Sequence, residues 1–512
     1  MRARFIKLLK IGALLFTASV VTLLAVRAFD SQRGAPLALW HTYAPHELTA
    51  QELATANWDD YLAAERKVFE SVRVNVTQKL DPEDQVPANR YFEGSPIYPG
   101  HFATDWNRSY ILEPEGTPVG AVVFLHGLTD SPYSLRHVAR LYQSHGFVSV
   151  AIRLPGHGTV PAGLTNVVWE DWVAATHLAV REARRRIGPT LPLHIIGFSN
   201  GGALAMKYAL DTLDDPKLTR PDRIVLISPM IGITEMARFA GIFGWPAIFP
   251  PFAKAAWLSV VPEFNPFKYN SFPINGARQS SLLTRALQPR IAQYASEGKL
   301  AELPPILTFQ SVVDFTVSTR AIITALYQQV PDNGSELVLF DINRSAKFGP
   351  LMRASANTML NRILPDPPRS FRSTVITNIS PDSSAVMERV TEAGATTEQT
   401  RELGLSYPLG VFSLSHVAVP FPMSDSLYGI QPDPLEEYGV SLGAVAPRGE
   451  RGTLIVSLDS LIRMSSNPFF PYMLERIEQG ITGNHPVSAA ENTANSAGES
   501  ASRDQAPADS AK

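Results

Sequence analysis

The chain has 512 residues, of which 45% are hydrophobic and 18% are charged. This composition can build a large buried core and excludes a disordered polymer for most of the chain. The formal charge is −3, so no net basic field is available to bind nucleic acid. Cysteine is absent, which excludes disulfide scaffolds, thiolate metal sites, iron–sulfur clusters and a cysteine nucleophile.

Residues 1–30 predict an N-terminal membrane helix. Basic residues open the segment: Arg2, Arg4, Lys7 and Lys10. The uncharged run Ile11–Val26 follows, and counting the helix from Phe5 reaches the length of about 20 residues that a membrane span requires. The cationic flank predicts that the rest of the chain lies on the non-cytoplasmic side, which is the periplasm in a double-membraned bacterium. The alternative is a cleaved signal peptide and a secreted protein, because Val26-Arg27-Ala28 resembles a cleavage site.

Residues 31–112 form a mixed N-terminal extension, with an amphipathic helix expected around Trp58–Val72. From residue 113 to about 480, short apolar runs alternate with helical periodicity. The runs are 121–125, 147–152, 193–196, 223–227, 305–309 and 336–340. Apolar strands alternating with helices predict an α/β fold, with a mostly parallel central sheet and helices on both faces. The tail, residues 481–512, is rich in small polar residues and is expected to be disordered.

A candidate nucleophile follows the predicted strand Leu193–Ile196. The segment Gly197–Gly201 has the pattern G-x-S-x-G, and the helical run Ala203–Leu210 comes next. In such a strand–turn–helix the sharp turn strains the serine backbone and exposes its hydroxyl at the amino end of a helix. Ser199 is therefore the predicted nucleophile.

A candidate oxyanion hole follows the first of the apolar runs. The strand ends in His126-Gly127-Leu128, and an HG-type turn here provides one of the two donors in this kind of enzyme. The predicted donors are the backbone N–H groups of Leu128 and Asn200, and His126 itself is expected to be a structural histidine beneath the loop.

The acid and the base are predicted from position and chain order. Asp314 follows the strand 305–309 closely, and Asp341, at the end of the next strand, is the rival acid. Hydrolases of this fold place serine, acid and histidine in that order along the chain. Of the eleven histidines, His416 and His485 lie beyond Asp314, and His485 borders the predicted disordered tail. His416 is therefore the predicted base.

Together these motifs resemble the α/β-hydrolase superfamily and, within it, the monoacylglycerol lipase, lysophospholipase and serine aminopeptidase-like (S33-type) hydrolases. The matching segments are His126–Pro132, Arg153–Gly158, Gly197–Gly201 and Ser415–Val417. The resemblance covers about residues 113–430. It implies a catalytic triad of Ser199, Asp314 and His416, oxyanion donors at Leu128 and Asn200, and no metal or organic cofactor. Arg153–Gly158 would be a structural loop at the rim of the site.

Two regions depart from a compact member of that superfamily. Asp314 and His416 are 102 positions apart (416 − 314), which implies an insertion at about 345–405 that could be a lid edge, a membrane contact or a dimer surface. A helical cap is predicted at about 233–303. It is rich in large apolar residues: Phe239, Ile242, Phe243, Trp245, Ile248, Phe249, Phe252 and Trp257. These residues favour an acyl-chain pocket, although packing of the cap on the core explains at least half of them.

The predicted function is hydrolysis of carboxylic esters, with lipid-like acyl esters such as a monoacylglycerol or a lysophospholipid as the substrate class. One alternative is an aminopeptidase, which requires an acidic subsite for the substrate's amino group, with Glu235 and Glu263 as candidates. Another is a non-catalytic, membrane-tethered binding protein. The predicted partners are the ester substrate and the membrane, without nucleic acid, and the oligomeric state stays open.

Overall fold

The computed structural model describes residues 2–31, 36–232, 250–342, 363–409, 414–443 and 465–483. Some of the features predicted from the sequence lie outside these residues. They are the apolar residues 239–249 of the predicted cap, Glu235, the insertion up to residue 362, His485 and the tail from residue 484.

Ten strands form one sheet in the order β1-β3-β2-β4-β5-β8-β9-β10-β11-β12. Their bounds are β1 (Tyr110–Leu112), β2 (Gly120–Leu125), β3 (Phe147–Ile152), β4 (Leu193–Phe198), β5 (Arg223–Ile227), β8 (Ile306–Ser311), β9 (Glu336–Asp341), β10 (Arg372–Asn378), β11 (Ala385–Thr391) and β12 (Gln399–Ser406). The strands from β3 to β10 in this order run parallel, whereas β1, β11 and β12 pair antiparallel with their neighbours. The predicted mostly parallel sheet is confirmed.

Helices cover both faces of this sheet, as the apolar strands predict. The helices of the domain are α5 (Arg136–Ser144), α6 (Trp169–Ile187), α7 (Asn200–Asp211), α9 (Ile274–Ser296) and α13 (Phe470–Thr482). In β2, Val123 and Leu125 belong to the buried cluster that contains residues of α6, α7 and α9. Val122 and Phe124 belong to the cluster that contains residues of α5 and α13. Alternate side chains of one strand thus enter two apolar cores.

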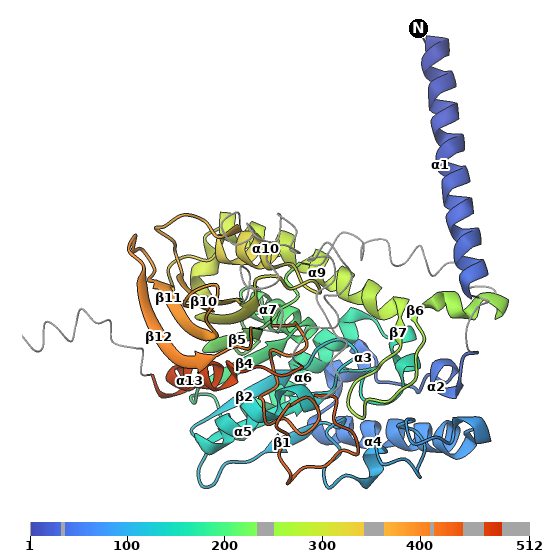
Figure 1. Ribbon diagram of the computed structural model, residues 1–512, viewed down its shortest axis with the longest axis horizontal. Coiled ribbons are helices and arrows are strands. Elements are labelled where there is room, and N and C mark those ends of the chain that lie inside the picture. The colour runs from blue at the N-terminus through green and yellow to red at the C-terminus, as the bar shows by residue number, and fades with distance from the viewer. Residues whose placement is uncertain are drawn as a thin grey trace, which may run out of the picture.

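The described part of the predicted insertion adds strands to the sheet. β10 pairs parallel with β9, and the antiparallel strands β11 and β12 extend the sheet beyond it (Figure 1). β12 ends the sheet and exposes most of its residues, including Arg401 and Glu402. Exposed charges on an edge strand disfavour pairing with another chain. Part of the distance between Asp314 and His416 in sequence is therefore taken up by sheet.

The N-terminal extension packs against the hydrolase core. It contains α2 (Leu39–Thr42), α3 (Ala50–Thr55) and α4 (Trp58–Asn75), so the predicted helix around Trp58–Val72 is confirmed. The sheet itself begins within the extension, because β1 pairs antiparallel with β3. Asn57 starts α4 with a capping box, in which its side chain accepts the N–H of Asp60 while the Asp60 carboxylate accepts the N–H of Asn57.

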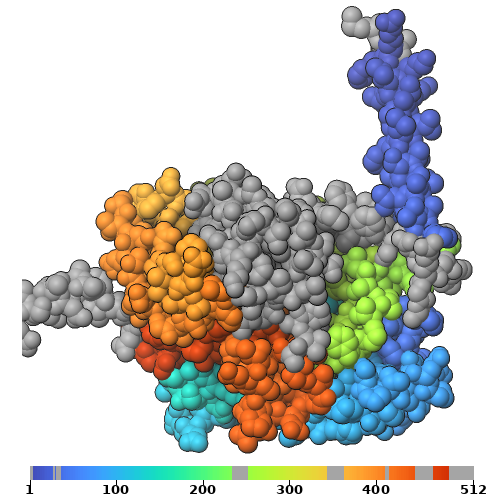
Figure 2. Space-filling model, in the orientation of Figure 1, coloured from blue at the N-terminus to red at the C-terminus, as the bar shows by residue number. Residues whose placement is uncertain are grey.

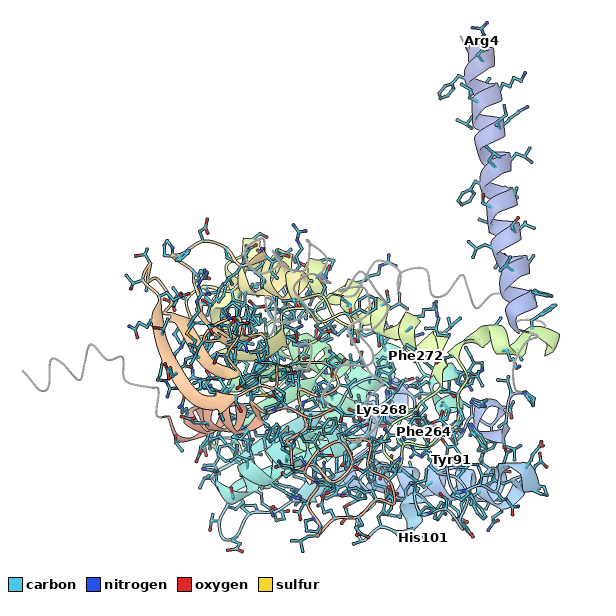
Figure 3. The ribbon with its side chains drawn as sticks, in the orientation of Figure 1. Arg4, Tyr91, His101, Phe264, Lys268 and Phe272 are labelled. Atoms are coloured by element: carbon cyan, nitrogen blue, oxygen red, sulfur yellow. The ribbon has the colours of Figure 1, made fainter. Side chains whose placement is uncertain are left out.

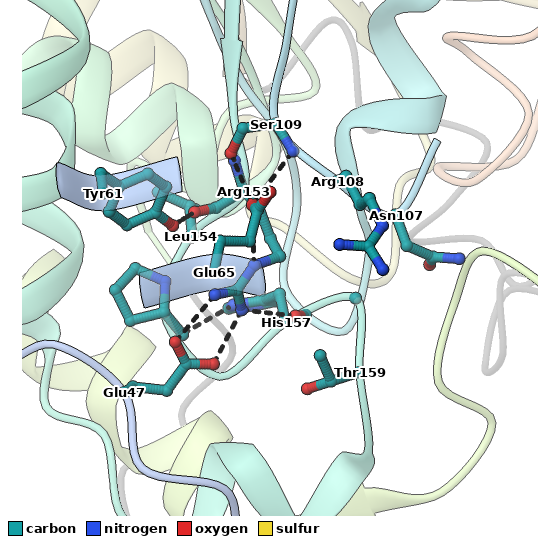
Figure 4. Close-up of polar contacts among 12 residues, drawn as sticks. Glu47, Tyr61, Glu65, Asn107, Arg108, Ser109, Arg153, Leu154, His157 and Thr159 are labelled. Carbon is teal, nitrogen blue, oxygen red and sulfur yellow. Dashed lines mark hydrogen bonds and ion pairs between the residues drawn. The ribbon is translucent and has the colours of Figure 1, made fainter. Parts of the chain in front are cut away.

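Arg153, at the end of β3, anchors the extension through a buried ionic cluster (Figure 4). Its Nη1 and Nη2 donate to the two carboxylate oxygens of Glu47 at 2.7 and 2.8 Å, and its Nε donates to Glu65 at 3.1 Å. Glu47 also accepts the N–H of Gly156 at 2.9 Å, and Ser109 donates to Glu65 from its backbone and its hydroxyl. The loop after β3 is thus held by carboxylates that come from the extension.

Helix α1 (Arg2–Ser31) extends away from the folded domain (Figures 1 and 2). Its segment Arg4–Val26 has 23 residues and is long and apolar enough to cross a membrane. At 1.5 Å per residue this segment measures roughly 34 Å, against about 30 Å for the hydrocarbon core of a bilayer. None of this segment is buried against the protein, and Figure 3 shows Arg4 near its far end. A signal sequence meets the same criteria.

The described part of the predicted cap, residues 250–303, contains a 3₁₀ segment (Pro250–Ala256), β6 (Trp257–Ser259), β7 (Phe272–Pro273) and α9. The 3₁₀ segment contacts α1, and α9 contacts α7. The loop between β6 and β7 packs on the N-terminal extension, since Arg90 donates to the carbonyl of Glu263 from its backbone and to that of Asn265 from its side chain.

Candidate active site

Ser199 occupies the sharp turn between β4 and α7. Its backbone has φ 54° and ψ −114°, a conformation that residues with a side chain rarely adopt. Two backbone hydrogen bonds hold the turn: the Ser199 N–H donates to Ile227 at 3.0 Å, and the Ser199 carbonyl accepts the N–H of Met230 at 2.9 Å. The serine is therefore fixed by the end of β5 and the residues that follow it.

Glycine is required on both sides of Ser199 because backbone groups fill the space of a side chain. A Cβ at Gly197 would lie 2.3 Å from the carbonyl oxygen of Gly201. A Cβ at Gly201 would lie 1.9 Å from the carbonyl oxygen of Leu125, at the end of β2. The G-x-S-x-G pattern thus reflects the close approach of the start of α7 to β2 and β4.

The structure brings Ser199, His416 and Asp314 into one hydrogen-bonded line. Nε2 of His416 lies 3.1 Å from Oγ of Ser199, and Nδ1 of His416 lies 2.8 Å from Oδ2 of Asp314. A carboxylate can only accept, so Nδ1 carries the proton and the unprotonated Nε2 can accept the serine hydroxyl. The imidazole stacks on Phe198 with ring centroids 5.3 Å apart. Ser199 and His416 are 5% and 6% exposed, so the serine–histidine hydrogen bond is largely shielded from water.

Asp314 follows β8 in a tight loop that fixes its carboxylate. Oδ1 accepts the backbone N–H groups of Thr316 and Val317 at 2.8 and 3.0 Å, which leaves Oδ2 for His416. The side chain of Asp314 is fully buried. The rival acid, Asp341, ends the neighbouring strand β9. Asp314 is thus the carboxylate that holds the imidazole of His416 in this structure.

The two predicted oxyanion donors belong to segments that adjoin Ser199. A Cβ at Gly127 would lie 3.3 Å from the Cβ of Ser199, so the loop that contains Leu128 adjoins the serine. Asn200 is the first residue of α7, and the N–H groups of a first helical turn have no acceptor within the helix. Thr129, with φ 61°, turns the chain directly after Leu128. An oxyanion role for the N–H groups of Leu128 and Asn200 stays a prediction.

His126 is a structural residue beneath that loop, as the sequence analysis expected. Its Nε2 accepts the N–H of Leu154 at 3.0 Å, so its Nδ1 is protonated and donates to the carbonyl of Gly127 at 2.9 Å. Burial, together with the neighbouring His157, keeps the pKa of His126 well below its usual value. The neutral ring thus connects the loop after β3 to the loop after β2.

Two contacts join segments that are distant in sequence, and local sequence patterns did not reveal them. From α9, Ser280 donates to the side-chain oxygen of Asn200 at 3.0 Å. Arg136 and Asp425 form a fully buried ion pair of 2.8 Å that ties α5 to the segment after His416. Burial alone would raise the pKa of Asp425, but Arg136 and His137 hold it well below its usual range. A signal for such pairs would have to come from covariation between positions.

Glu263, one candidate for an aminopeptidase subsite, is already engaged. Its carboxylate is 1% exposed and accepts the backbone N–H groups of Asn270 and Ser271 at 2.9 and 2.7 Å. These bonds close the loop between β6 and β7. In the described residues, no group of three or more His, Asp or Glu side chains is arranged to hold a metal ion.

Comparison with known proteins gives matches for part of the chain. The family model described as "Serine aminopeptidase, S33" matches residues 116–333. A thermostable monoacylglycerol lipase from Bacillus sp. (strain H-257) is 33% identical over 95 residues, which are 19% of this chain and 36% of the lipase. The chain thus aligns with only about a third of that lipase's length.

Solved structures of lipolytic enzymes are similar to part of the chain. The structure reported for the metagenome-derived lipolytic enzymes LipS and LipT is 20% identical, covers 46% of this chain and 88% of its own, and has a TM-score of 0.35. Monoacylglycerol lipase from Paleococcus ferrophilus is 17% identical, covers 48% of this chain and 94% of its own, and has a TM-score of 0.34.

The parallel sheet, its helices and the strained serine turn define the class of protein: the chain has an α/β-hydrolase fold. Within that class, residues 116–333 match the S33 family model, and part of the chain is similar to a monoacylglycerol lipase.

Proposed function

We propose that the protein is a serine hydrolase that cleaves carboxylic esters with a Ser199–His416–Asp314 triad. The observation that carries this proposal is the continuous hydrogen-bonded line from Ser199 through His416 to Asp314, with distances of 3.1 and 2.8 Å. The strained backbone of Ser199 supports it, because such a conformation persists at functional sites where the surrounding structure enforces it. A serine without a catalytic role would have no function to offset the energetic cost of this strain.

The mechanism follows from the protonation states. Nε2 of His416 accepts the hydroxyl proton while Oγ of Ser199 attacks the ester carbonyl, and Asp314 stabilises the imidazolium. The N–H groups of Leu128 and Asn200 bind the oxyanion of the tetrahedral intermediate. His416 then protonates the leaving alcohol, whose C–O bond breaks to give the acyl-enzyme. A water molecule that His416 deprotonates releases the acid and restores Ser199.

We further propose that the substrates are lipid-like acyl esters presented at a membrane. The membrane-spanning length of Arg4–Val26 and the contact of α1 with the 3₁₀ segment Pro250–Ala256 support this substrate class. The name of the similar Bacillus protein, a monoacylglycerol lipase, points the same way. The basic flank of α1 favours a catalytic domain on the non-cytoplasmic side.

The test uses the full-length protein in detergent micelles and a fluorophosphonate probe that labels activated serines. We expect the wild type to be labelled, and Ser199→Ala and His416→Ala to lose labelling. The matched control is Ser131→Ala, which removes the hydroxyl of a buried serine in the loop after β2 and should leave labelling unchanged. Absence of labelling in the wild type would favour a non-catalytic binding protein.

Substrate class is tested separately with esters of increasing acyl length and with aminoacyl anilides. A lipid-like preference predicts that kcat/KM rises with acyl length and that glycerol monoesters are cleaved. Turnover of anilides without turnover of esters would favour the aminopeptidase alternative, against which the buried and bonded carboxylate of Glu263 already argues.

A further inference from the structure

A cavity lies at the amino ends of the parallel strands, whereas Ser199 lies at their carboxyl ends. Its volume is about 400 Å³, and it is lined at the amino ends of β5, β8, β9 and β10 and by α13, a helix that Figure 1 shows near β12. β5 runs from Arg223 at this cavity to Ile227, whose carbonyl accepts the N–H of Ser199. At about 3.3 Å per residue, the cavity is one strand length, roughly 13 Å, from the catalytic turn.

Arginine side chains dominate the charge of this cavity. Arg223, Arg372 and Arg476 line it together with Glu336 and Glu392, so the formal charge of the lining is +3 − 2 = +1. Glu336 pairs with both Arg476 and Arg372. Glu392, which is 41% exposed, pairs with Arg372 at 3.3 Å. Both carboxylates are therefore already paired, Glu336 with Arg372 and Arg476 and Glu392 with Arg372.

Neither carboxylate forms an ion pair with Arg223, the third arginine of the cavity. In the described part of the chain its guanidinium forms no hydrogen bond or ion pair, and its Nε is buried without a partner. Burial lowers the pKa of Arg223, and Tyr142 and Glu336 offset this effect only in part. A largely buried guanidinium without a partner is costly, and an anion in the cavity would remove that cost.

The backbone of α13 makes room for this guanidinium. A Cβ at Gly480 would lie 2.1 Å from Cζ and 2.3 Å from Nε of Arg223. Glycine in the last turn of α13 thus lets the guanidinium lie against the helix, beside its carbonyl end, which favours a positive charge. The position of Arg223 is built into the fold.

We propose that this cavity binds the phosphate group of a small anion. Arg223 comes from β5, Arg372 from β10 and Arg476 from α13, so their guanidinium groups converge from separate elements. Guanidinium groups bind phosphate and carboxylate through paired N–H donors. A tetrahedral phosphate offers acceptors in several directions, whereas a carboxylate offers two oxygens in one plane. The volume exceeds that of free phosphate, so a phosphomonoester is the favoured ligand.

Isothermal titration calorimetry on the full-length protein tests this site. The probes are inorganic phosphate, glycerol phosphate and acetate, at constant ionic strength set with chloride. We expect saturable binding of glycerol phosphate, weaker binding of phosphate and none of acetate. Arg223→Gln should weaken binding at least tenfold. The matched control is Arg220→Gln, because Arg220 lies close in sequence but pairs with Glu302 at the surface, and this variant should bind like the wild type.

Arg372→Gln provides a second variant in case Arg223→Gln does not fold, and it should also weaken binding. Three outcomes would overturn the proposal: no saturable binding of either phosphate compound, acetate binding as tight as glycerol phosphate binding, or an equal loss in Arg220→Gln. Fluorophosphonate labelling of Ser199 does not enter this readout, so the anion site and the proposed hydrolase activity stand or fall separately.

Discussion

The buried cluster at Arg153 predicts that the N-terminal extension stabilises the hydrolase core. We choose Glu47→Gln as the perturbation, because glutamine keeps the shape and one acceptor but removes the charge. The Glu47 and Arg153 side chains are 7% and 1% exposed, so the ion pair is almost completely shielded from water. The variant would leave Arg153 buried with Glu65 as its remaining carboxylate partner (Figure 4).

The expected magnitude follows from burial. Removing one partner of a buried ion pair costs about 3–5 kcal/mol. Glu65 still compensates part of the charge, and glutamine can still accept one hydrogen bond, so we expect a loss at the lower end, about 3 kcal/mol. Such a loss is a large fraction of the total stability of about 5–15 kcal/mol that is typical of folded proteins.

Urea unfolding of the full-length protein in detergent, followed by tryptophan fluorescence, measures the effect. The matched control is Glu70→Gln, which removes a carboxylate from the same helix as Glu65 but from an exposed pair with Arg73, and its unfolding midpoint should stay unchanged. Limited proteolysis should also release the extension faster from Glu47→Gln. If the two variants unfold at the same urea concentration, the extension does not stabilise the core through this cluster.

Further predictions concern the catalytic turn, a helix and a buried histidine. Asp314→Asn should lower kcat on the order of 1000-fold or more, because the imidazole loses its orienting acceptor. The unfolding midpoint should change little. Unchanged turnover would exclude the triad. Gly201→Ala should prevent folding, because its Cβ would lie 1.9 Å from a carbonyl oxygen. The Cβ of Gly276→Ala would have no neighbour closer than 3.7 Å. This second variant should therefore fold and gain about 0.5–1 kcal/mol of stability from helix propensity. Circular dichroism and thermal melts distinguish the two. Burial lowers the pKa of His41 from 6.5 to about 4, so the unfolded chain takes up a proton at a higher pH than the folded protein. The contribution of His41 to stability is therefore present above pH 6.5 and is lost as the pH falls toward 4. The stability difference between wild type and His41→Gln should therefore shrink by about 3 kcal/mol between pH 7 and pH 4, and a constant difference would show that His41 is not buried as a neutral ring.

Local patterns in the sequence determined the central strands, from β2 to β9 in chain order, and the turn at Ser199. Apolar runs with intervening helical periodicity require a sheet that is covered on both faces, and the structure has that sheet. The sharp turn could be predicted from the glycines around Ser199 because their cause is local. The chain turns so tightly that backbone atoms fill the space of a side chain. Chain order, with His485 set aside at the edge of the predicted disordered tail, indicated His416 as the base, and the structure places it 3.1 Å from Ser199.

Only the tertiary structure decided which distant groups meet. The sequence left Asp314 and Asp341 as rival acids, and the fold pairs Asp314 with His416 because its loop turns Oδ2 toward the imidazole. Residues 372–406, which the sequence left without a defined structure, extend the sheet. The ion pairs of Arg153 with Glu47 and of Arg136 with Asp425 join residues more than a hundred positions apart. No periodic pattern in the sequence indicates such ion pairs. Their strength depends on burial and on the distance between the two side chains, and both are set only once the chain has folded.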